Sequence, residues 1–283
     1  MKKGINYWAF PHGQGGRPPD PMDAMRAARR LGFDCMELTV DADGPISLAT
    51  TRGEAERVRR AADDMGLKLL TVASGLAWGT SPTHPDEAVR DEAVRNYEKV
   101  LEVASWLGAE TVLYIPGMVS ASFVPEFAPQ PYDRVLAWAR DSLRHVLPAA
   151  ERLGVKIGVE NVWNRFLLSP LEMCAFIDSF GSPQVGSYFD VGNVMLFGHP
   201  EHWIQILGPR ILAVHLKDFR VAVGNLDGFV DLLSGDVNYP AVMRAFRAIG
   251  YDGPFTAEIV PGKPGDVEKA IAALNVIEHM QGG

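Results

Sequence analysis

The sequence predicts a (β/α)8 barrel formed by one domain over residues 1–283. Eight short apolar runs, rich in β-branched residues, alternate with eight longer amphipathic stretches, which is the count that this barrel requires. The short runs are too brief for helices and too continuously apolar for half-exposed strands, so we expect buried parallel strands. No low-complexity linker divides the chain, which supports a single domain.

Each element is expected where its pattern begins and ends. The expected strands are residues 4–8, 35–40, 69–74, 111–116, 156–162, 185–193, 211–218 and 255–260. The expected helices are residues 21–31, 52–65, 86–107, 133–153, 170–180, 201–207, 239–249 and 266–280. Five helices are followed by a glycine and an apolar residue, which is the signal of a left-handed C-cap: Gly32, Gly66, Gly108, Gly154 and Gly250. Asp20-Pro21 and Ser169-Pro170 each combine an N-cap residue with a proline at the first helical position.

A doubly wound sheet is the competing architecture. Its phosphate-binding signature, Gly-x-Gly-x-x-Gly at the start of a helix, does not follow the first strand. Residues 12–17 resemble it superficially, but they lack the full spacing and run into Pro18 and Pro19. We therefore expect a flexible first βα loop, and we prefer the (β/α)8 barrel to the doubly wound sheet.

Charge and composition exclude several classes of protein. The chain has 27 Lys and Arg against 35 Asp and Glu, a net charge of −8, so nucleic acid is not expected as a partner. Cys35 and Cys174 cannot form a disulfide framework, and both lie in apolar runs typical of small core residues. The N-terminus lacks the apolar region of a signal peptide, and no apolar run is long enough to cross a membrane. These features predict a cytoplasmic protein without a membrane partner.

The last four expected strands each deliver an ionisable residue near the end at which such barrels place their catalytic groups. These residues are Glu160, Asp190, His215 and Glu258. Three carboxylates so close together would repel one another unless a cation lay between them. Oxygen ligands with one imidazole and no thiolate suit one divalent metal ion, with Mn²⁺ favoured and Co²⁺, Mg²⁺ or Zn²⁺ as alternatives.

Four segments around these residues resemble the metal-site strands of the xylose-isomerase-like TIM-barrel superfamily: residues 158–161, 189–193, 214–218 and 256–259. Residues 32–38, 235–240 and 250–254 also match, so the resemblance covers essentially the whole chain. Within the superfamily, the chain is most similar to ketose and ketose-phosphate 3-epimerases, particularly the L-ribulose/L-xylulose 5-phosphate branch.

The resemblance implies that Glu160, Asp190, His215 and Glu258 are the metal ligands, and that Glu160 and Glu258 are also the catalytic acid and base. The expected reaction moves a proton at C3 of a sugar or sugar phosphate through a metal-stabilised enediolate. Asn161, Asn193, Lys217 and Asp218 are expected to contact these ligands or the substrate. A homo-oligomer fits the resemblance, because barrels of this type commonly pair through their outer helices.

Two departures from the free-ketose enzymes favour a phosphorylated substrate. Asn193 stands where those enzymes have a histidine, and Val221 stands where they have an arginine. Lys217 and Arg220 are the nearest residues expected to contact an anion, and Trp8 is expected to wall the sugar pocket at the end of the first strand.

Other reactions of the superfamily remain as alternatives: a sugar-phosphate isomerase, a hydroxypyruvate or inosose isomerase, or a dehydratase. An abasic-site endonuclease of this fold is disfavoured, because residues 73–76 and 114–117 supply no histidine at the ends of the third and fourth strands. A non-catalytic sugar-binding barrel is also disfavoured, since it would not need two metal-bound glutamates.

Overall fold

The computed structural model describes residues 1–12 and 18–280, and it confirms the (β/α)8 prediction. The barrel strands are β1 (Lys2–Asn6), β2 (Cys35–Thr39), β3 (Thr71–Ala73), β4 (Thr111–Tyr114), β5 (Lys156–Glu160), β6 (Val185–Asp190), β7 (Ile211–Leu216) and β10 (Pro254–Ala257). The helices are α1 (Pro21–Leu31), α2 (Arg52–Met65), α3 (Glu87–Leu107), α4 (Tyr132–Leu153), α5 (Pro170–Asp178), α6 (Pro200–Leu207), α7 (Tyr239–Ala248) and α8 (Asp266–His279).

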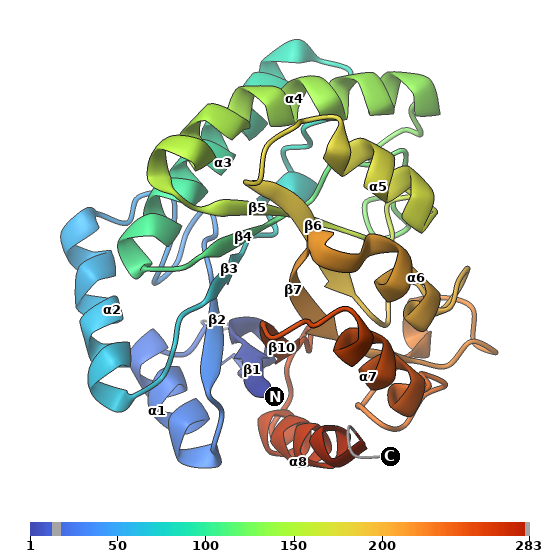
Figure 1. Ribbon diagram of the computed structural model, residues 1–283. Helices are drawn as coiled ribbons and strands as arrows, with labels where there is room; N and C mark the ends of the chain where they lie inside the picture. Colours follow the sequence, from blue (N-terminus) through green and yellow to red (C-terminus); the bar gives the residue numbers. More distant parts are fainter. Residues whose placement is uncertain (13–17, 281–283) are drawn as a thin grey trace.

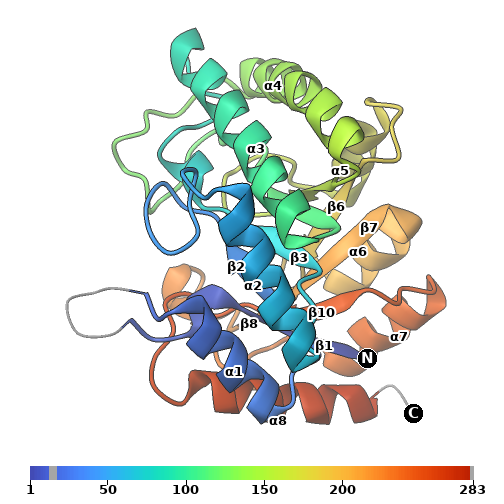
Figure 2. The same ribbon diagram turned by 90° about the vertical axis from the view of Figure 1, so that its left-hand side faces the viewer.

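The strands close into one parallel barrel in the order β1-β10-β7-β6-β5-β4-β3-β2. The helices follow one another around the outside of this barrel (Figure 1), and adjacent helices such as α3 and α4 lie side by side in both views (Figure 2). Because all the strands are parallel, their carboxyl ends meet at one end of the barrel. The residues that end strands far apart in the sequence are therefore neighbours in space.

The expected helix caps are present. Gly32, Gly66, Gly108 and Gly154 end their helices with positive φ angles, and Gly250 follows α7 with φ of 70°.

The two predicted N-caps are confirmed as well. The side chain of Asp20 accepts a hydrogen bond from Met22 N at 2.7 Å, and Ser169 Oγ accepts one from Glu172 N at 3.2 Å. Local sequence therefore determines where these helices begin.

Several strand boundaries differ from the prediction. β6 ends at Asp190 rather than at residue 193, because the Asp190 carboxylate accepts a hydrogen bond from Asn193 N at 2.7 Å and turns the chain. The first strand spans Lys2–Asn6 and not residues 4–8, and a short 3₁₀ helix, η1 (Tyr7–Ala9), follows it. Trp8 therefore lies in the connection after β1 and does not end the strand.

The connection between β7 and α7 contains a small hairpin that the sequence did not predict. β8 (Asp218–Phe219) pairs in antiparallel fashion with β9 (Phe229–Val230). The Asp218 carboxylate accepts hydrogen bonds from Gly235 N at 3.0 Å and Val237 N at 3.2 Å. Two-residue strands are too short to produce a hydrophobic pattern, so the sequence carries no signal for this hairpin.

Three further expectations have separate outcomes. Cys35 is buried, whereas Cys174 is only partly buried because it lies where α5 meets α6, with its thiol 3.6 Å from the Ile206 carbonyl oxygen.

The predicted flexible loop falls, apart from His12, outside the described residues. Among the helices that the structure describes, none combines the length and apolar character needed to cross a membrane.

Candidate active site

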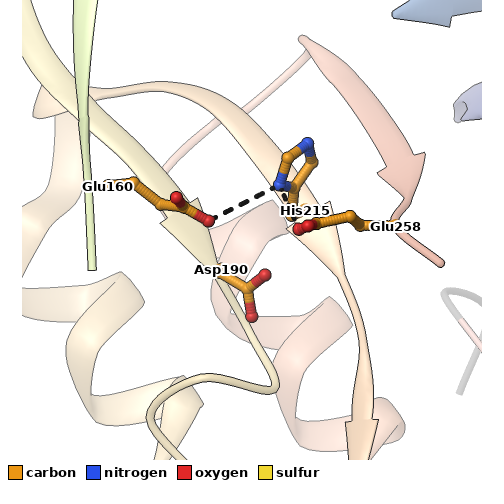
Figure 3. A group of neighbouring side chains, drawn as sticks. All are labelled: Glu160, Asp190, His215 and Glu258. Carbon is orange, nitrogen blue, oxygen red and sulfur yellow. Dashed lines mark ion pairs between the residues drawn. The ribbon is translucent and has the colours of Figure 1, made fainter. Parts of the chain in front are cut away.

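Four ionisable side chains converge at the carboxyl end of the barrel. Glu160 ends β5, Asp190 ends β6, His215 lies in β7, and Glu258 directly follows β10. One ligand atom from each lies within 4.8 Å of the others, and Figure 3 shows the four side chains directed at a common point. All four residues predicted as metal ligands are therefore brought together.

Strand register explains this convergence. Asp190 is the register partner of His215 on the neighbouring strand. Thr256 is the partner of His215 on the other side, and Glu258 follows two residues later, so that its side chain returns to the same face. Because alternate residues of a strand share a face, the spacing in the sequence directs these groups into the barrel mouth.

A lysine lies against this cluster. Lys217 Nζ is 2.9 Å from Glu258 Oε2 and 3.3 Å from Asp190 Oδ2. His215 Nδ1 is 2.6 Å from Glu258 Oε2 and 3.7 Å from Glu160 Oε1 (Figure 3). The charged groups are thus packed closely enough to determine one another's protonation.

The cluster fits a divalent cation. Three of its buried polar atoms make no hydrogen bond, namely Asp190 Oδ2, His215 Nδ1 and Glu258 Oε2. The last two atoms lie 2.6 Å apart in an ion-pair contact. Buried polar atoms normally have partners, and here the atoms without one belong to neighbouring candidate ligands. Carboxylate oxygens and one imidazole nitrogen suit a hard or borderline metal such as Mn²⁺.

The protein's own groups show strong electrostatic coupling in this cluster. Burial raises the pKa of Glu160, and it raises that of Asp190 to about 7 although Lys217 opposes the change. Burial also acts on Glu258, but Lys217 and His215 outweigh it and hold the pKa of this carboxyl below its usual range. The buried carboxylates therefore depend on nearby positive charge to stay ionised; Lys217 and His215 supply such charge, and a divalent cation would supply more.

Asn161 and Asn193 hold the ends of β5 and β6 together. The Asn161 side chain accepts a hydrogen bond from Asp190 N at 2.9 Å and donates one to Asp190 O at 2.8 Å. Asn193 Nδ2 donates to Asn161 O at 3.1 Å. These contacts fix the backbone that carries Asp190, so the two amides position a candidate ligand.

The cluster lies at one side of a cavity of about 850 Å³. Glu160, Glu258, Lys217 and Asn193 contribute to its lining. Its aromatic walls come from five residues in different connections: Trp8, Trp78, Phe123, Trp163 and Phe229. Aromatic faces beside polar groups are typical of pockets that bind sugars or other small polar molecules.

The other predicted contact residues lie in different places. Trp8 lines the cavity as expected, although it follows β1 rather than ending it. Arg220 is exposed and donates through Nε to Ser234 O at 3.1 Å, and it is not among the described residues that line the cavity. Asp218 shapes the hairpin through backbone hydrogen bonds. Lys217 is thus the nearest cation to the cluster in the part of the chain that the structure describes.

Sequence reasoning gave no role to Glu37. This residue lies in β2, is 1% exposed, and hydrogen-bonds to His215. Its signal in the sequence was a carboxylate inside the apolar run of an expected strand, since a charge in such a place needs a specific partner.

Comparison with known proteins shows the family to which the chain belongs. The family described as "Xylose isomerase-like TIM barrel" matches residues 25–278. The chain is 28% identical over 184 residues to "Uncharacterized protein MJ1311" of Methanocaldococcus jannaschii, a match that covers 63% of this chain and 60% of that protein. It is 22% identical over 241 residues to L-ribulose-5-phosphate 3-epimerase UlaE of Salmonella paratyphi A, covering 84% and 81% of the two chains.

A solved structure shows the same fold. The crystal structure of D-psicose 3-epimerase in the presence of D-fructose superposes with a TM-score of 0.81 at 18% identity, and the alignment covers 100% of both chains. This structural likeness shows the fold alone. The family assignment depends on the match of the family model to residues 25–278, which spans most of the chain. This protein belongs to the xylose isomerase-like TIM barrel family.

Proposed function

We propose that this protein is a metal-dependent ketose 3-epimerase. The observation that carries the proposal is the placement of two glutamates, Glu160 and Glu258, on different sides of one cation-binding cluster beside a large cavity (Figure 3). Epimerisation inverts one carbon, so it requires a group that removes a proton on one face and a group that returns a proton on the other.

The names of similar proteins support this reaction class. UlaE is named an L-ribulose-5-phosphate 3-epimerase, and the D-psicose enzyme of known structure is also a 3-epimerase. Both names describe inversion at C3 of a ketose, which is the chemistry that paired carboxylates serve.

Glu160, Asp190, His215 and Glu258 would hold one divalent cation, for which Mn²⁺ is the favoured choice. Such a cation supplies positive charge that stabilises negative charge developing on substrate oxygens. Glu258, whose carboxyl group Lys217 and His215 keep ionised, removes the C3 proton of one epimer from its own side of the substrate, and Glu160, whose pKa is raised by burial, delivers a proton from the other side. The two glutamates exchange these roles for the opposite epimer.

Neighbouring residues prepare the site for this proton transfer. Lys217 Nζ contacts Glu258 at 2.9 Å and supplies positive charge beside the carboxylate. The rings of Trp163 and Phe229 pack at a tilt, with their centroids 5.1 Å apart, and form an apolar wall of the cavity. An apolar wall excludes water and offers a flat surface to the C–H groups of a sugar.

The cavity charge favours an uncharged ketose over a ketose phosphate. Seven described lining residues are acidic: Asp41, Glu160, Asp218, Asp227, Asp231, Glu258 and Asp266. Two described lining residues, Lys217 and Lys263, are basic. A phosphate dianion needs compensating cations or N–H donors, and Lys217 is already in contact with two carboxylates. This part of the proposal departs from the phosphorylated substrate that the sequence favoured.

Solvent deuterium tests the two-base mechanism. In deuterated water, the wild-type protein loaded with Mn²⁺ should place deuterium at C3 of the inverted ketose. Glu258→Gln and Glu160→Gln should each slow inversion by roughly 10²–10⁴-fold, because each lacks one general acid–base group. Each variant should still exchange the C3 proton of one epimer slowly without inversion, and the two variants should act on opposite epimers.

Metal content must be measured in both variants, because loss of the cation would imitate loss of a base. Glu268→Gln, an exposed substitution on α8, serves as the matched control and should leave the rate unchanged. Wild-type inversion by either metal-loaded site variant would contradict the mechanism, as would full activity after exhaustive chelation with EDTA. Proton transfer between C1 and C2 without inversion would indicate an aldose–ketose isomerase instead.

A further inference from the structure

Glu37 is a buried carboxylate that the proposed reaction does not use. It lies in β2, where the whole strand is buried, and its side chain has no exposed surface. A carboxylate in such a place is costly unless other groups hydrogen-bond to it. Glu37 has two such partners from distant parts of the chain: His215 Nε2 at 2.7 Å and the Tyr188 hydroxyl, which donates to the other carboxylate oxygen.

The contact with His215 determines which imidazole nitrogen is free. A carboxylate accepts hydrogen bonds, so His215 Nε2 carries the proton in this contact. The opposite nitrogen, Nδ1, faces the cluster and lies 2.6 Å from Glu258 and 3.7 Å from Glu160. Nδ1 is therefore the nitrogen directed at the candidate metal site.

Tyr188 constrains the same imidazole in a second way. Its ring lies against that of His215, with the centroids 4.5 Å apart, while its hydroxyl holds Glu37. The His215 ring is thus held by Glu37 at Nε2 and packs against the tilted ring of Tyr188. β2 and β7 are not paired in the barrel, so this contact crosses the interior beneath the cluster.

We propose that Glu37, supported by Tyr188, is a positioning residue that sets the tautomer and orientation of His215 for metal binding through Nδ1. The inference rests on the metal site of the proposed function. Carboxylates that hold a metal-binding histidine in this way typically contribute 10–100-fold to metal affinity. A buried pair with a purely structural role would affect folding stability and leave the affinity for metal unchanged.

The test measures Mn²⁺ affinity directly, from the electron paramagnetic resonance signal of free Mn²⁺ at constant pH. Glu37→Leu should weaken binding by roughly 10–100-fold, since it removes the acceptor for Nε2–H. Glu37→Gln keeps an oxygen acceptor of similar shape, so most of the affinity should return. Tyr188→Phe should weaken binding less than Glu37→Leu, because the contact between Glu37 and His215 survives.

Tyr97→Phe is the matched control for loss of a buried tyrosine hydroxyl. Tyr97 accepts a hydrogen bond from Ile115 N at 2.9 Å, so this variant should melt earlier and bind Mn²⁺ as the wild type does. Wild-type affinity in folded Glu37→Leu would overturn the proposal. If Glu37→Leu does not fold, the comparison uses the other two variants. Equal Mn²⁺ affinities in Tyr188→Phe and Tyr97→Phe would then overturn the proposal.

The readout does not depend on turnover. A wild-type protein that binds Mn²⁺ but inverts no ketose would refute the proposed function, while the affinities of the variants would still decide the role of Glu37. A wild-type protein that binds no Mn²⁺ would refute the positioning role as well.

Discussion

Lys217 supplies positive charge among three carboxylates at the candidate metal site. Its ammonium group contacts both Asp190 and Glu258, and its side chain is only 18% exposed. Removal of one partner from a buried ion pair typically costs about 3–5 kcal/mol, because the remaining charge is left without compensation. Lys217 therefore stabilises the protein when no metal neutralises these carboxylates.

Lys217→Met keeps most of the apolar stem and removes the charge. The metal-free variant should melt well below the metal-free wild type, because its carboxylates repel one another. Added Mn²⁺ restores positive charge, so the increase in Tm on Mn²⁺ addition should be larger in the variant than in the wild type. Differential scanning fluorimetry with EDTA or Mn²⁺ measures both effects.

Lys263→Met provides the control for this measurement, because Lys263 is exposed at the rim of the same cavity. Its Mn²⁺-dependent increase in Tm should equal that of the wild type. Equal increases in Lys217→Met and wild type would show that Lys217 does not compensate the cluster.

At the scale of elements, the turn after β6 explains how Lys217 reaches the cluster. A Cβ atom on Gly192 would lie 2.5 Å from Lys217 Cβ and 3.0 Å from its carbonyl carbon. Real Cβ atoms do not approach other atoms so closely, so glycine at this position allows β7 to pack against the turn. The turn that ends β6 thus places Asp190 and accommodates Lys217 at the same time.

Helix ends give a prediction about stability. α4 ends at Gly154 with φ of 68°, and no atom lies within 4 Å of the place that a Cβ would occupy. Gly154→Ala therefore meets backbone strain without a steric clash, and it should lower the free energy of unfolding by about 1–2 kcal/mol. Gly154→Asn should lower it less, because asparagine tolerates this conformation better.

Gly53→Ala is the matched control, and it should change the free energy of unfolding in the opposite direction. Gly53 lies within α2, and its nearest potential contact is a flexible arginine nitrogen at 3.9 Å. Alanine there should stabilise the protein by about 0.4–1 kcal/mol. Thermal denaturation of the variants tests both effects, and an unchanged Tm in Gly154→Ala would show that the C-cap conformation is not what requires glycine.

At the scale of the whole molecule, charge and cavity size bear on the substrate. The chain has a net charge of −8, and acidic residues also outnumber basic ones in the described lining of the cavity. Both features disfavour polyanionic partners through long-range repulsion. The volume of about 850 Å³ lies within the range of pockets for small molecules.

A panel of ketopentoses and ketohexoses, free and 5- or 6-phosphorylated, tests the choice of substrate with Mn²⁺ present. We expect the highest kcat/KM on a free ketose, because the acidic lining repels a phosphate. A higher kcat/KM on L-ribulose 5-phosphate than on every free ketose would contradict the charge argument. That result would leave the two-base mechanism standing.

The sequence by itself determined the barrel and the four candidate ligands. Eight apolar runs that alternate with amphipathic stretches, without the phosphate-binding signature of a doubly wound sheet, predicted a parallel barrel. That topology brings Glu160, Asp190, His215 and Glu258 to one end because parallel strands end on the same side. Glycines after the helices determined where the helices end, since left-handed conformations are a local property of the backbone.

Only the tertiary structure decided the contacts that cross the barrel. Glu37 and His215 are 178 residues apart, and a hydrophobic pattern shows that both are buried without showing that they meet. The same reason explains why the prediction that Arg220 contacts the substrate could not be made reliably from sequence. Arg220 follows a strand that carries a candidate ligand, yet its side chain contacts Ser234 at the surface. Pairing between nonadjacent strands depends on how the barrel closes and on which side chains fill its interior, and neither is encoded in the local periodicity of one chain.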